Sequence, residues 1–381
     1  MKASIGITIL VTDPVNDTLF SNGIRQNVIL LQEMYKKCKN IHESFIINVS
    51  KTDPELYKKT SWEKYSKDII SIEEAVEKCD IIVICHGSLH LDVISKFKSK
   101  GKKIVKQVLG AELSIFNETV LFKPEPYGIF GNSSYTDAVW TSPHFYERDK
   151  GFLEARYRCP VYEAPYIWDP RFIEDHVKLN KKNNPDRVVE YSPKSEKKRI
   201  SVIEPNLNLV KNSTVPIIIC ELFFRKNPDA IEKVSIFGGS IIKTKKDMIA
   251  FVIDLDISKA KKIFFEARYP IVWTLSTHTD ILLSHQSGCE LNYAYLDAAW
   301  LGYPVVHNSP MMKGLGWYYP ENNHVIASEH LLYIIRNFDN IDYPNNKYLD
   351  ESRKFASQYM MDNPKNKKGY EILIDKLLKR D

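Results

Sequence analysis

Short apolar runs alternate with segments of helical periodicity along most of the 381-residue chain. In the first half the apolar runs are residues 4–11, 45–49, 80–85 and 103–109, and an amphipathic pattern at 22–37 follows the first of them. Apolar runs of this length, bounded by turn residues, are typical of buried strands. Strands separated by helices are typical of a parallel sheet covered by helices. We therefore expect an α/β protein.

The alternation is interrupted once, by the charged, Asn- and Lys-rich residues 171–198. This composition is typical of a linker or a solvated excursion. Because a single hydrophobic core stops growing near ~250–300 residues, the length favours two domains. We predict an N-terminal domain at 1–175, a charged linker at 176–198, a second α/β domain at 199–345, and a C-terminal helix with a basic tail at 346–381. Further strands are expected at 127–130 and 138–141.

The charge balance gives little support to nucleic-acid binding. The 53 basic and 48 acidic residues leave a net charge of +5, well short of the concentrated basic surface that duplex binding usually needs. The six cysteines show no CxxC spacing, which disfavours a zinc ribbon and favours reduced thiols. No run reaches ~18 apolar residues, and Asp13 and Pro14 stand where a signal peptide would be cleaved. We expect a cytoplasmic protein, with at most peripheral membrane contact through the basic tail.

Polar residues are crowded into the otherwise apolar segment 284–316, SHQSGCELNYAYLDAAWLGYPVVHNSPMMKGLG. The polar residues in question are His285, Asn292, Asp297, His307 and Asn308. Buried polar groups need hydrogen-bond partners, which a bound ligand would supply. The alternative is an ordinary connection in which Gly302 ends a helix and Pro304 begins a strand.

The run from Asp297 to Pro304, DAAWLGYP, resembles the donor-binding signature of GT-B glycosyltransferases, acidic-Ala-x-Ala-x-Gly-x-Pro. The chain is most similar to the retaining bacterial and viral family. The resemblance implies two Rossmann-like domains whose parallel sheets face a central cleft. It also implies that Asp297 accepts hydrogen bonds from the ribose hydroxyls of a nucleoside-diphosphate sugar.

The same resemblance suggests further donor-binding residues. Asn292 is one, and His307, Asn308 and Ser309 are expected on the sugar or phosphate side of the ligand. Retaining members usually carry a second acidic residue eight positions before the first, which falls on Cys289 here. Glu290, one residue later, is therefore the candidate for the catalytic carboxylate of this domain.

A loop follows the expected strand at 199–203 and reaches Lys211 before the next helix. This arrangement resembles the opening of the GT-B C-terminal domain, where a basic residue holds the donor pyrophosphate. A lysine there would act as a point charge against the leaving diphosphate. Alternatively, Lys211 is one solvated lysine among many.

In the N-terminal half, Asn22 and Gly23 lie between the first strand and the first helix, where GT-B enzymes place a glycine-containing loop near the acceptor. His86 and Glu112 follow successive strands, so we expect them at the same edge of the sheet. His86 is a candidate general base or hydrogen-bond donor. The simpler alternative is a strand-end histidine bonded to a neighbouring carbonyl.

Asp254-Leu255-Asp256 forms a DxD triplet, which glycosyltransferases of the GT-A fold use to hold a divalent metal on the donor diphosphate. Three-residue matches are common by chance, so we predict no metal at Asp254 and Asp256 and a metal-independent reaction. The chain has no GxGxxG and no GxSxG, which disfavours a dinucleotide cofactor and a hydrolase nucleophile elbow.

The sequence therefore predicts a glycosyltransferase that moves a sugar from a nucleoside-diphosphate sugar to a glycan, a lipid-linked acceptor or another acceptor. Retention of the anomeric configuration follows from the family likeness alone. Two alternatives stay open. One is a non-catalytic protein of the same fold that binds a sugar nucleotide or a glycan, as the departure at Cys289 would suit. The other is a DNA-modifying glucosyltransferase, which would need a basic stripe.

Overall fold

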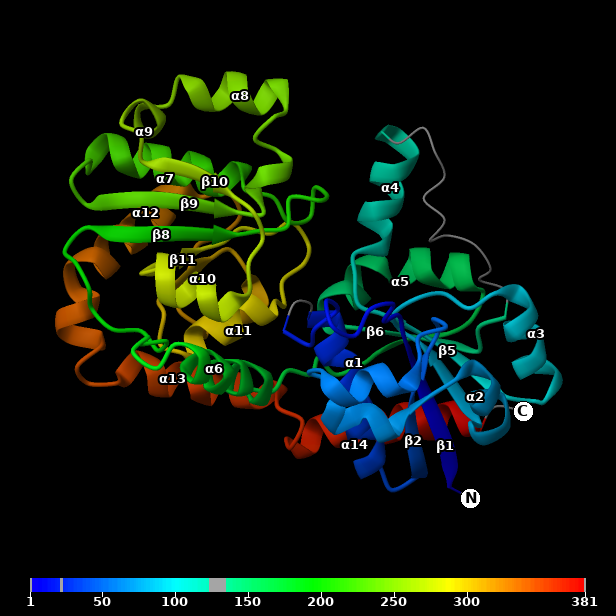
Figure 1. Cartoon of the computed structure of the whole chain (residues 1–381). Helices are drawn as coiled ribbons and strands as arrows, with labels where there is room; N and C mark the ends of the chain where they lie inside the picture. Colours follow the sequence, from blue (N-terminus) through cyan, green and yellow to red (C-terminus); the bar gives the residue numbers. More distant parts are fainter. Residues whose placement is uncertain (1, 21–22, 123–134, 380–381) are drawn as a thin grey trace. The chain divides into compact units, whose positions relative to one another are not determined.

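The computed structural model describes residues 2–20, 23–122 and 135–379 (Figure 1). The chain divides into two compact units. Unit 1 contains the described residues up to Phe172 together with those from Tyr359 onward, and unit 2 contains Ile173–Gln358. The predicted strand at 127–130 lies outside the described residues.

Unit 1 is built on one parallel sheet, which has seven strands within the described residues, in the order β3-β2-β1-β4-β5-β6-β7. All neighbouring pairs are parallel. The strands are β1 (Ala3–Ile9), β2 (Ile41–Asn48), β3 (Ile69–Ile70), β4 (Ile81–Ile84), β5 (Lys103–Val108), β6 (Ala138–Thr141) and β7 (Val161–Glu163). The predicted strands at 4–11, 80–85 and 103–109 are thus confirmed in position to within two residues.

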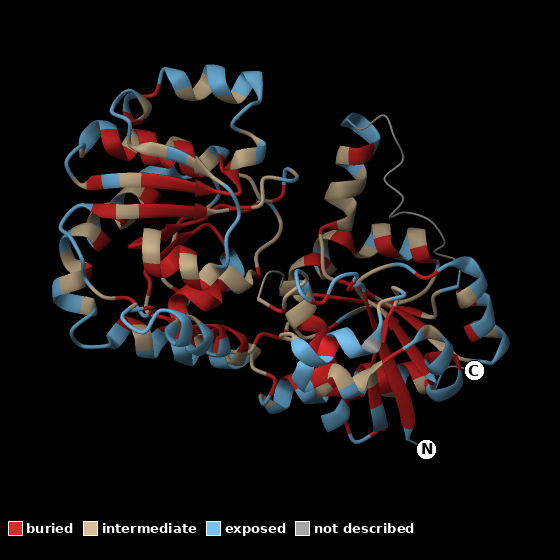
Figure 2. Ribbon diagram, in the orientation of Figure 1, coloured by how far each residue is buried: buried red, intermediate tan, exposed pale blue. Residues whose placement is uncertain are grey.

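Helices connect these strands and cover the sheet, as a parallel topology requires. They are α1 (Gly23–Lys37), α2 (Ile72–Lys78), α3 (Leu91–Ser99), α4 (Glu112–Phe122), α5 (Pro143–Tyr157) and α14 (Pro364–Leu378). α2 begins with a capping box, in which Ser71 and Glu74 each accept a hydrogen bond from the other's backbone amide. Figure 2 shows the sheet strands as the buried layer of the unit.

Unit 2 repeats the architecture with a second parallel sheet, in the order β10-β9-β8-β11-β12-β13 among the described residues. Its strands are β8 (Lys198–Ile203), β9 (Ile231–Phe237), β10 (Ile263–Glu266), β11 (Ile281–Leu283), β12 (Val305–His307) and β13 (Trp317–Tyr318). Its helices are α6 (Arg171–Asn183), α7 (Thr214–Lys226), α8 (Lys246–Ile253), α9 (Asp256–Lys259), α10 (Ile271–His278), α11 (Tyr293–Trp300), α12 (His324–Tyr333) and α13 (Lys347–Ala356), and a π-helical stretch covers Ile334–Asp342. The α/β class with two parallel sheets is confirmed.

Two segments differ from the sequence-based expectation. Part of the predicted linker is α6, an amphipathic helix whose buried face consists of Phe172, Ile173, His176 and Val177. The C-terminal segment is not a separate appendage, because α14 is part of unit 1. There Tyr370 lies edge-on to Tyr35, with ring centroids 5.6 Å apart, and its hydroxyl donates to the backbone oxygen of Pro165.

No helix in the described ranges is both long and apolar enough to cross a bilayer. In a parallel sheet all strands end at the same edge, and ligands of open α/β sheets bind beyond the carboxyl ends of the strands. A ligand of unit 2 is therefore expected at the loops after β8, β9, β11 and β12.

Candidate functional site

Buried polar residues follow three neighbouring strands of the unit 2 sheet. Glu204 comes directly after β8, the tripeptide Ser284-His285-Gln286 after β11, and Asn308-Ser309 after β12. All of these side chains are nearly or completely withdrawn from solvent. Their concentration at one edge of a parallel sheet marks the candidate site.

Glu204 is the centre of this cluster, with only 1% of its surface exposed. Its Oε1 accepts a hydrogen bond from the Ser284 hydroxyl, which also lies 2.7 Å from the Tyr295 hydroxyl. Its Oε2 is buried and makes no hydrogen bond to any described residue. Burial raises the pKa of the Glu204 carboxyl to about 7, although Lys211, Ser284 and the His285 amide act to lower it. The site thus contains a carboxyl group that is partly protonated at neutral pH.

His285 directly follows Ser284, and its ring is held by Tyr319. The Tyr319 hydroxyl donates to the backbone oxygen of Ser284 at 2.9 Å, so at 3.1 Å it accepts from Nδ1 of His285. This fixes the tautomer with the proton on Nδ1 and leaves Nε2 as an acceptor. Burial lowers the pKa of His285 to about 4, so the ring is neutral at neutral pH.

The last residue of β12 and the two that follow it, which are predicted to face the sugar or phosphate, are held by internal hydrogen bonds. His307 has no exposed surface; its Nδ1 accepts from the Ser309 amide at 3.0 Å, and its Nε2 lies 2.6 Å from the Leu315 oxygen. Asn308 pairs its side-chain amide with the backbone of Gln286 on both sides, at 2.8 Å each. The Ser309 hydroxyl donates to the backbone oxygen of Glu290 at 2.6 Å. These side chains shape the loops rather than present free polar groups.

Helix α11 lies between β11 and β12 and carries the remaining predicted donor residues. Asn292 is its N-cap, and its side-chain oxygen accepts from the Ala294 amide at 3.1 Å. Asp297 lies one turn further along and is 9% exposed. Glu290 precedes the helix, and its carboxylate accepts from the Met311 amide at 2.9 Å.

The loop that carries Lys211 is attached to the same edge. The Ser287 amide donates to the Val210 oxygen at 2.9 Å, joining this loop to the segment that leads into α11. The loop is folded on itself, because the Asn206 side chain accepts from the Ser213 amide at 2.8 Å. The positive charge of Lys211 acts to lower the pKa of Glu204, so the lysine is near enough to the buried carboxyl to interact with it electrostatically. The structure thus brings Lys211 to the segment that leads into α11.

Unit 1 holds the predicted acceptor residues. Asn22 lies outside the described residues, and Gly23 is the first residue of α1. His86 follows β4 and is half-buried; its Nδ1 accepts from the Leu10 amide at 3.4 Å, which leaves the proton on Nε2. Burial and Arg25 lower the pKa of His86, so the ring is neutral and suited to donate a hydrogen bond.

Glu112 begins α4 and is held by α5. Its carboxylate pairs with Arg156 at 3.1 Å and accepts from the Tyr157 hydroxyl at 3.2 Å. These contacts fix α4 to α5 through the carboxylate, so Glu112 has a structural role in the protein as it stands.

The DxD aspartates do not lie at the carboxyl ends of the strands. Asp254 ends α8 and Asp256 begins α9, the short helix that leads into the amino end of β10. Asp256 lies 3.3 Å from Arg225. The described residues contain no group of three His, Cys, Asp or Glu side chains that could hold a metal ion.

A protein family described as "Protein of unknown function (DUF2827)" matches residues 5–374. The chain belongs to this family. Among curated proteins none matches.

Solved structures of glycosyltransferases share the fold of this DUF2827 chain. A glycosyltransferase from Rickettsia africae is 13% identical with a TM-score of 0.58, and each chain covers 100% of the other. HepE from Anabaena, solved with UDP and glucose, is 11% identical with a TM-score of 0.55 and 99% coverage of both chains. The trehalose-6-phosphate synthase OtsA is 9% identical with a TM-score of 0.55, again with 100% coverage of both. The chain therefore has the GT-B fold, as the DAAWLGYP resemblance implied.

The two side chains at the centre of the buried cluster of this DUF2827 chain, Glu204 and Ser284, were not among the predicted site residues. One signal was present for Glu204, because an acidic residue directly after an apolar strand-forming run falls at the carboxyl end of that strand. Ser284 and its neighbour Tyr295 carry no signal of their own. Serine and tyrosine are common in any helix or loop, and only their distances to Glu204 reveal them.

Gly238, directly after the neighbouring strand β9, lies against the backbone of Glu204. It has φ +77°, and a Cβ atom there would clash with the backbone oxygen of Glu204. We expect Gly238→Ala to lower the free energy of unfolding by at least about 1 kcal/mol, because the conformation and the contact both disfavour a side chain. Urea unfolding would measure this. As a control, Gly151→Ala inside α5, where a Cβ meets nothing within 4 Å, should stabilise the protein. If both substitutions change the free energy of unfolding equally, the conformation of Gly238 and its contact with Glu204 do not disfavour a side chain there.

Proposed function

We propose that the protein is a glycosyltransferase that uses a nucleoside-diphosphate sugar, with the donor bound at the carboxyl edge of the unit 2 sheet. One observation carries the proposal. The hydrogen bond from the Ser287 amide to the Val210 oxygen joins the loop of Lys211 to the segment that leads to Asp297. The two residues that the family resemblance assigns to the diphosphate and the ribose are far apart in sequence, yet their segments belong to one edge.

In this proposal the ends of the nucleotide are recognised by different chemistry. Asp297 accepts hydrogen bonds from the ribose hydroxyls, for which a carboxylate with two acceptor oxygens is well suited. Lys211 places a positive charge at the diphosphate. Asn292, His307, Asn308 and Ser309 act by holding the loops after β11 and β12 in place, since the structure engages their side chains internally.

The proposed reaction is transfer of the sugar between two oxygens. The bond from the anomeric carbon to the diphosphate breaks, a bond to an acceptor hydroxyl forms, and the hydroxyl proton leaves with the nucleoside diphosphate or a nearby base. Lys211 stabilises the negative charge that develops on the leaving group. Glu290 is the proposed carboxylate near the sugar, and His86 with Gly23 in unit 1 the proposed acceptor contacts. Metal independence and retention follow the family resemblance.

A thermal-shift panel of UDP-, GDP-, ADP- and TDP-sugars, each with and without EDTA, tests the donor assignment. UDP-glucose leads the panel, because the similar Anabaena protein was solved with UDP-glucose. A ligand present at 100 times its Kd stabilises a protein by about 2.7 kcal/mol, so one donor should raise the Tm clearly. If no donor does so, the site assignment is wrong. A shift that EDTA abolishes would overturn metal independence and direct attention to Asp254 and Asp256.

Release of free nucleotide distinguishes a transferase from a binding protein. With the donor that gives the largest thermal shift, we expect slow hydrolysis without acceptor and faster release when a suitable glycan is added. Stabilisation without any release over hours, with glycan, lipid-linked and DNA acceptors all tried, would favour the non-catalytic protein that the departure at Cys289 suits. Release stimulated only by DNA would favour the DNA-modifying enzyme.

A further inference from the structure

Helix α8 and the edge strand β10 form an apolar surface on unit 2 that the proposed donor site does not use. The helix has the sequence KDMIAFVI, yet none of its residues is buried. A helix this apolar is normally covered by protein or by lipid. The most exposed apolar side chains of this surface are Ile241 at 44%, Ile249 at 48%, Ile253 at 61% and Phe264 at 44%.

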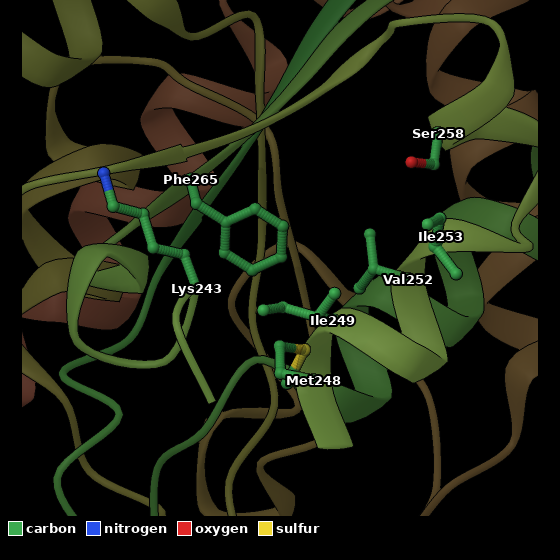
Figure 3. A pocket seen from close by; sticks show the side chains of 7 residues that line it. All are labelled: Lys243, Met248, Ile249, Val252, Ile253, Ser258 and Phe265. Carbon is green, nitrogen blue, oxygen red and sulfur yellow. The ribbon is translucent and has the colours of Figure 1, made fainter. Parts of the chain in front are cut away.

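A pocket of about 270 Å³ opens between the helix and the strand (Figure 3). Met248, Ile249 and Val252 from α8 form one wall, and Phe265 from β10 faces them. Lys243 lies at one end and Ser258 at the other. The surface is therefore hollowed and apolar at its centre and polar at its ends.

Lysines frame this surface on both sides. Three lysines lie at the start of α8: Lys243, Lys245 and Lys246. Two more follow Ser258 at the other end of the pocket: Lys259 and Lys261. All five are exposed, and none forms an ion pair with another described residue. Of the three aspartates in the segment, Asp256 is paired with Arg225, which leaves Asp247 and Asp254. The surface thus carries an excess of positive charge around an apolar centre.

An apolar centre surrounded by lysines fits one class of binding partner better than the others. A second copy of the chain related by a two-fold axis would bring like charges together, because such an interface pairs a surface with itself. A protein partner is disfavoured by composition, since interfaces are depleted in lysine and enriched in Arg, Tyr and Trp. Residues 241–265 contain six lysines and no Arg, Tyr or Trp. An anionic membrane surface attracts lysines and accepts aliphatic side chains below its headgroups.

We propose that the α8–β10 surface docks unit 2 onto an anionic membrane, with Ile249, Ile253 and Phe264 entering the headgroup region and the surrounding lysines facing acidic lipid headgroups. Because this binding uses no residue of the donor site, it is independent of the proposed reaction.

Flotation of the full-length protein with vesicles tests the proposal. We expect binding to vesicles of phosphatidylcholine containing 30% phosphatidylglycerol, weak binding to pure phosphatidylcholine, and loss of binding as salt rises. Each lysine near such a surface contributes about fivefold to the partition coefficient. Lys243→Gln with Lys246→Gln should therefore weaken binding by about 25-fold, and Ile249→Ser with Ile253→Ser should weaken it at every salt concentration.

Two matched controls lie on α6 in the same unit, where Lys182 and Leu179 are also exposed. Lys182→Gln and Leu179→Ser should leave vesicle binding unchanged. The four substituted positions of the α8–β10 surface and the two control positions are all exposed, so the variants should keep the wild-type Tm. Equal binding of the α8 variants and the wild type would overturn the proposal, as would wild-type protein that binds neither vesicle. Failure of vesicle binding together with concentration-dependent dimerisation that Ile253→Ser abolishes would assign the surface to a second copy.

Discussion

Replacing Asp297 with alanine is expected to weaken nucleotide binding by about 10- to 100-fold. In the proposed complex its carboxylate accepts hydrogen bonds from the two ribose hydroxyls, and hydrogen bonds to a charged group contribute about 1.5–3 kcal/mol. Isothermal titration calorimetry with the nucleotide that gives the largest thermal shift would measure the loss. Asp297→Asn, which keeps one acceptor oxygen and the size of the side chain, should lose less than Asp297→Ala.

Asp350→Ala is the matched control for this experiment. Asp350 is an exposed aspartate in the first turn of α13, a helix of the same unit that packs against α11. Its removal changes the net charge as Asp297→Ala does, but should leave nucleotide affinity unchanged. If both variants bind as the wild type does, Asp297 does not contact the ribose. If Asp297→Ala lowers affinity only together with a large fall in Tm, its role is to hold α11 in place.

The strand–helix alternation was predictable from sequence because parallel strands are buried on both faces and appear as continuous apolar runs. β1, with all seven residues buried, and β4 are examples. Helix α6 was not predicted because its buried face needs only Phe172, Ile173, His176 and Val177, while charged residues and Asn together make up most of its composition. The helical pattern near the C-terminus was visible in the sequence. Its packing of Tyr370 against Tyr35 and Trp140 was not, since nothing local signals a contact over such a sequence separation.

In the candidate site, too, some features were predictable from the sequence and others were not. The position of Asp297 on a helix followed by Gly302 and a strand was predictable from the DAAWLGYP run. The hydrogen-bond partners of the polar residues at the end of β12 and directly after it were not predictable. Sequence shows that His307 and Asn308 follow an apolar strand, but their partners are the Leu315 oxygen and the Gln286 backbone. Which buried polar groups are satisfied by the protein, and which await a ligand, depends on these tertiary contacts.

Glu204 should make the stability of the protein depend on pH in the opposite sense from an ordinary paired carboxylate. Its pKa is raised from 4.5 to about 7, chiefly by burial. Between these values the unfolded chain releases the proton more readily than the folded protein does. The stability that Glu204 contributes is thus full below about pH 4.5, falls as pH rises, and is lost above about pH 7. The loss amounts to about 3 kcal/mol, since one pKa unit corresponds to about 1.4 kcal/mol.

Glu204→Gln removes this titration while keeping the shape of the side chain. Relative to the wild type, the free energy of unfolding of the variant should rise by about 3 kcal/mol between pH 4.5 and pH 8, as measured by urea unfolding at several pH values. Subtracting the wild-type curve cancels the titration of neighbouring groups, among them His285, Tyr295 and Tyr319.

Glu221→Gln is a matched control with the opposite sign, because it replaces another buried glutamate of unit 2. Burial acts to raise the pKa of Glu221, but the amides of Ile257 and Asp256, each 3.0 Å away, and Arg225 outweigh this and lower it. Its contribution is present above the ordinary pKa and is lost only as pH falls through the lowered value. Glu221→Gln should therefore cost the same stability throughout pH 5 to 8. If Glu204→Gln gives the same flat difference over this range, Glu204 is ionised in the folded protein, and Lys211 then faces a full negative charge rather than a carboxyl that is neutral below about pH 7.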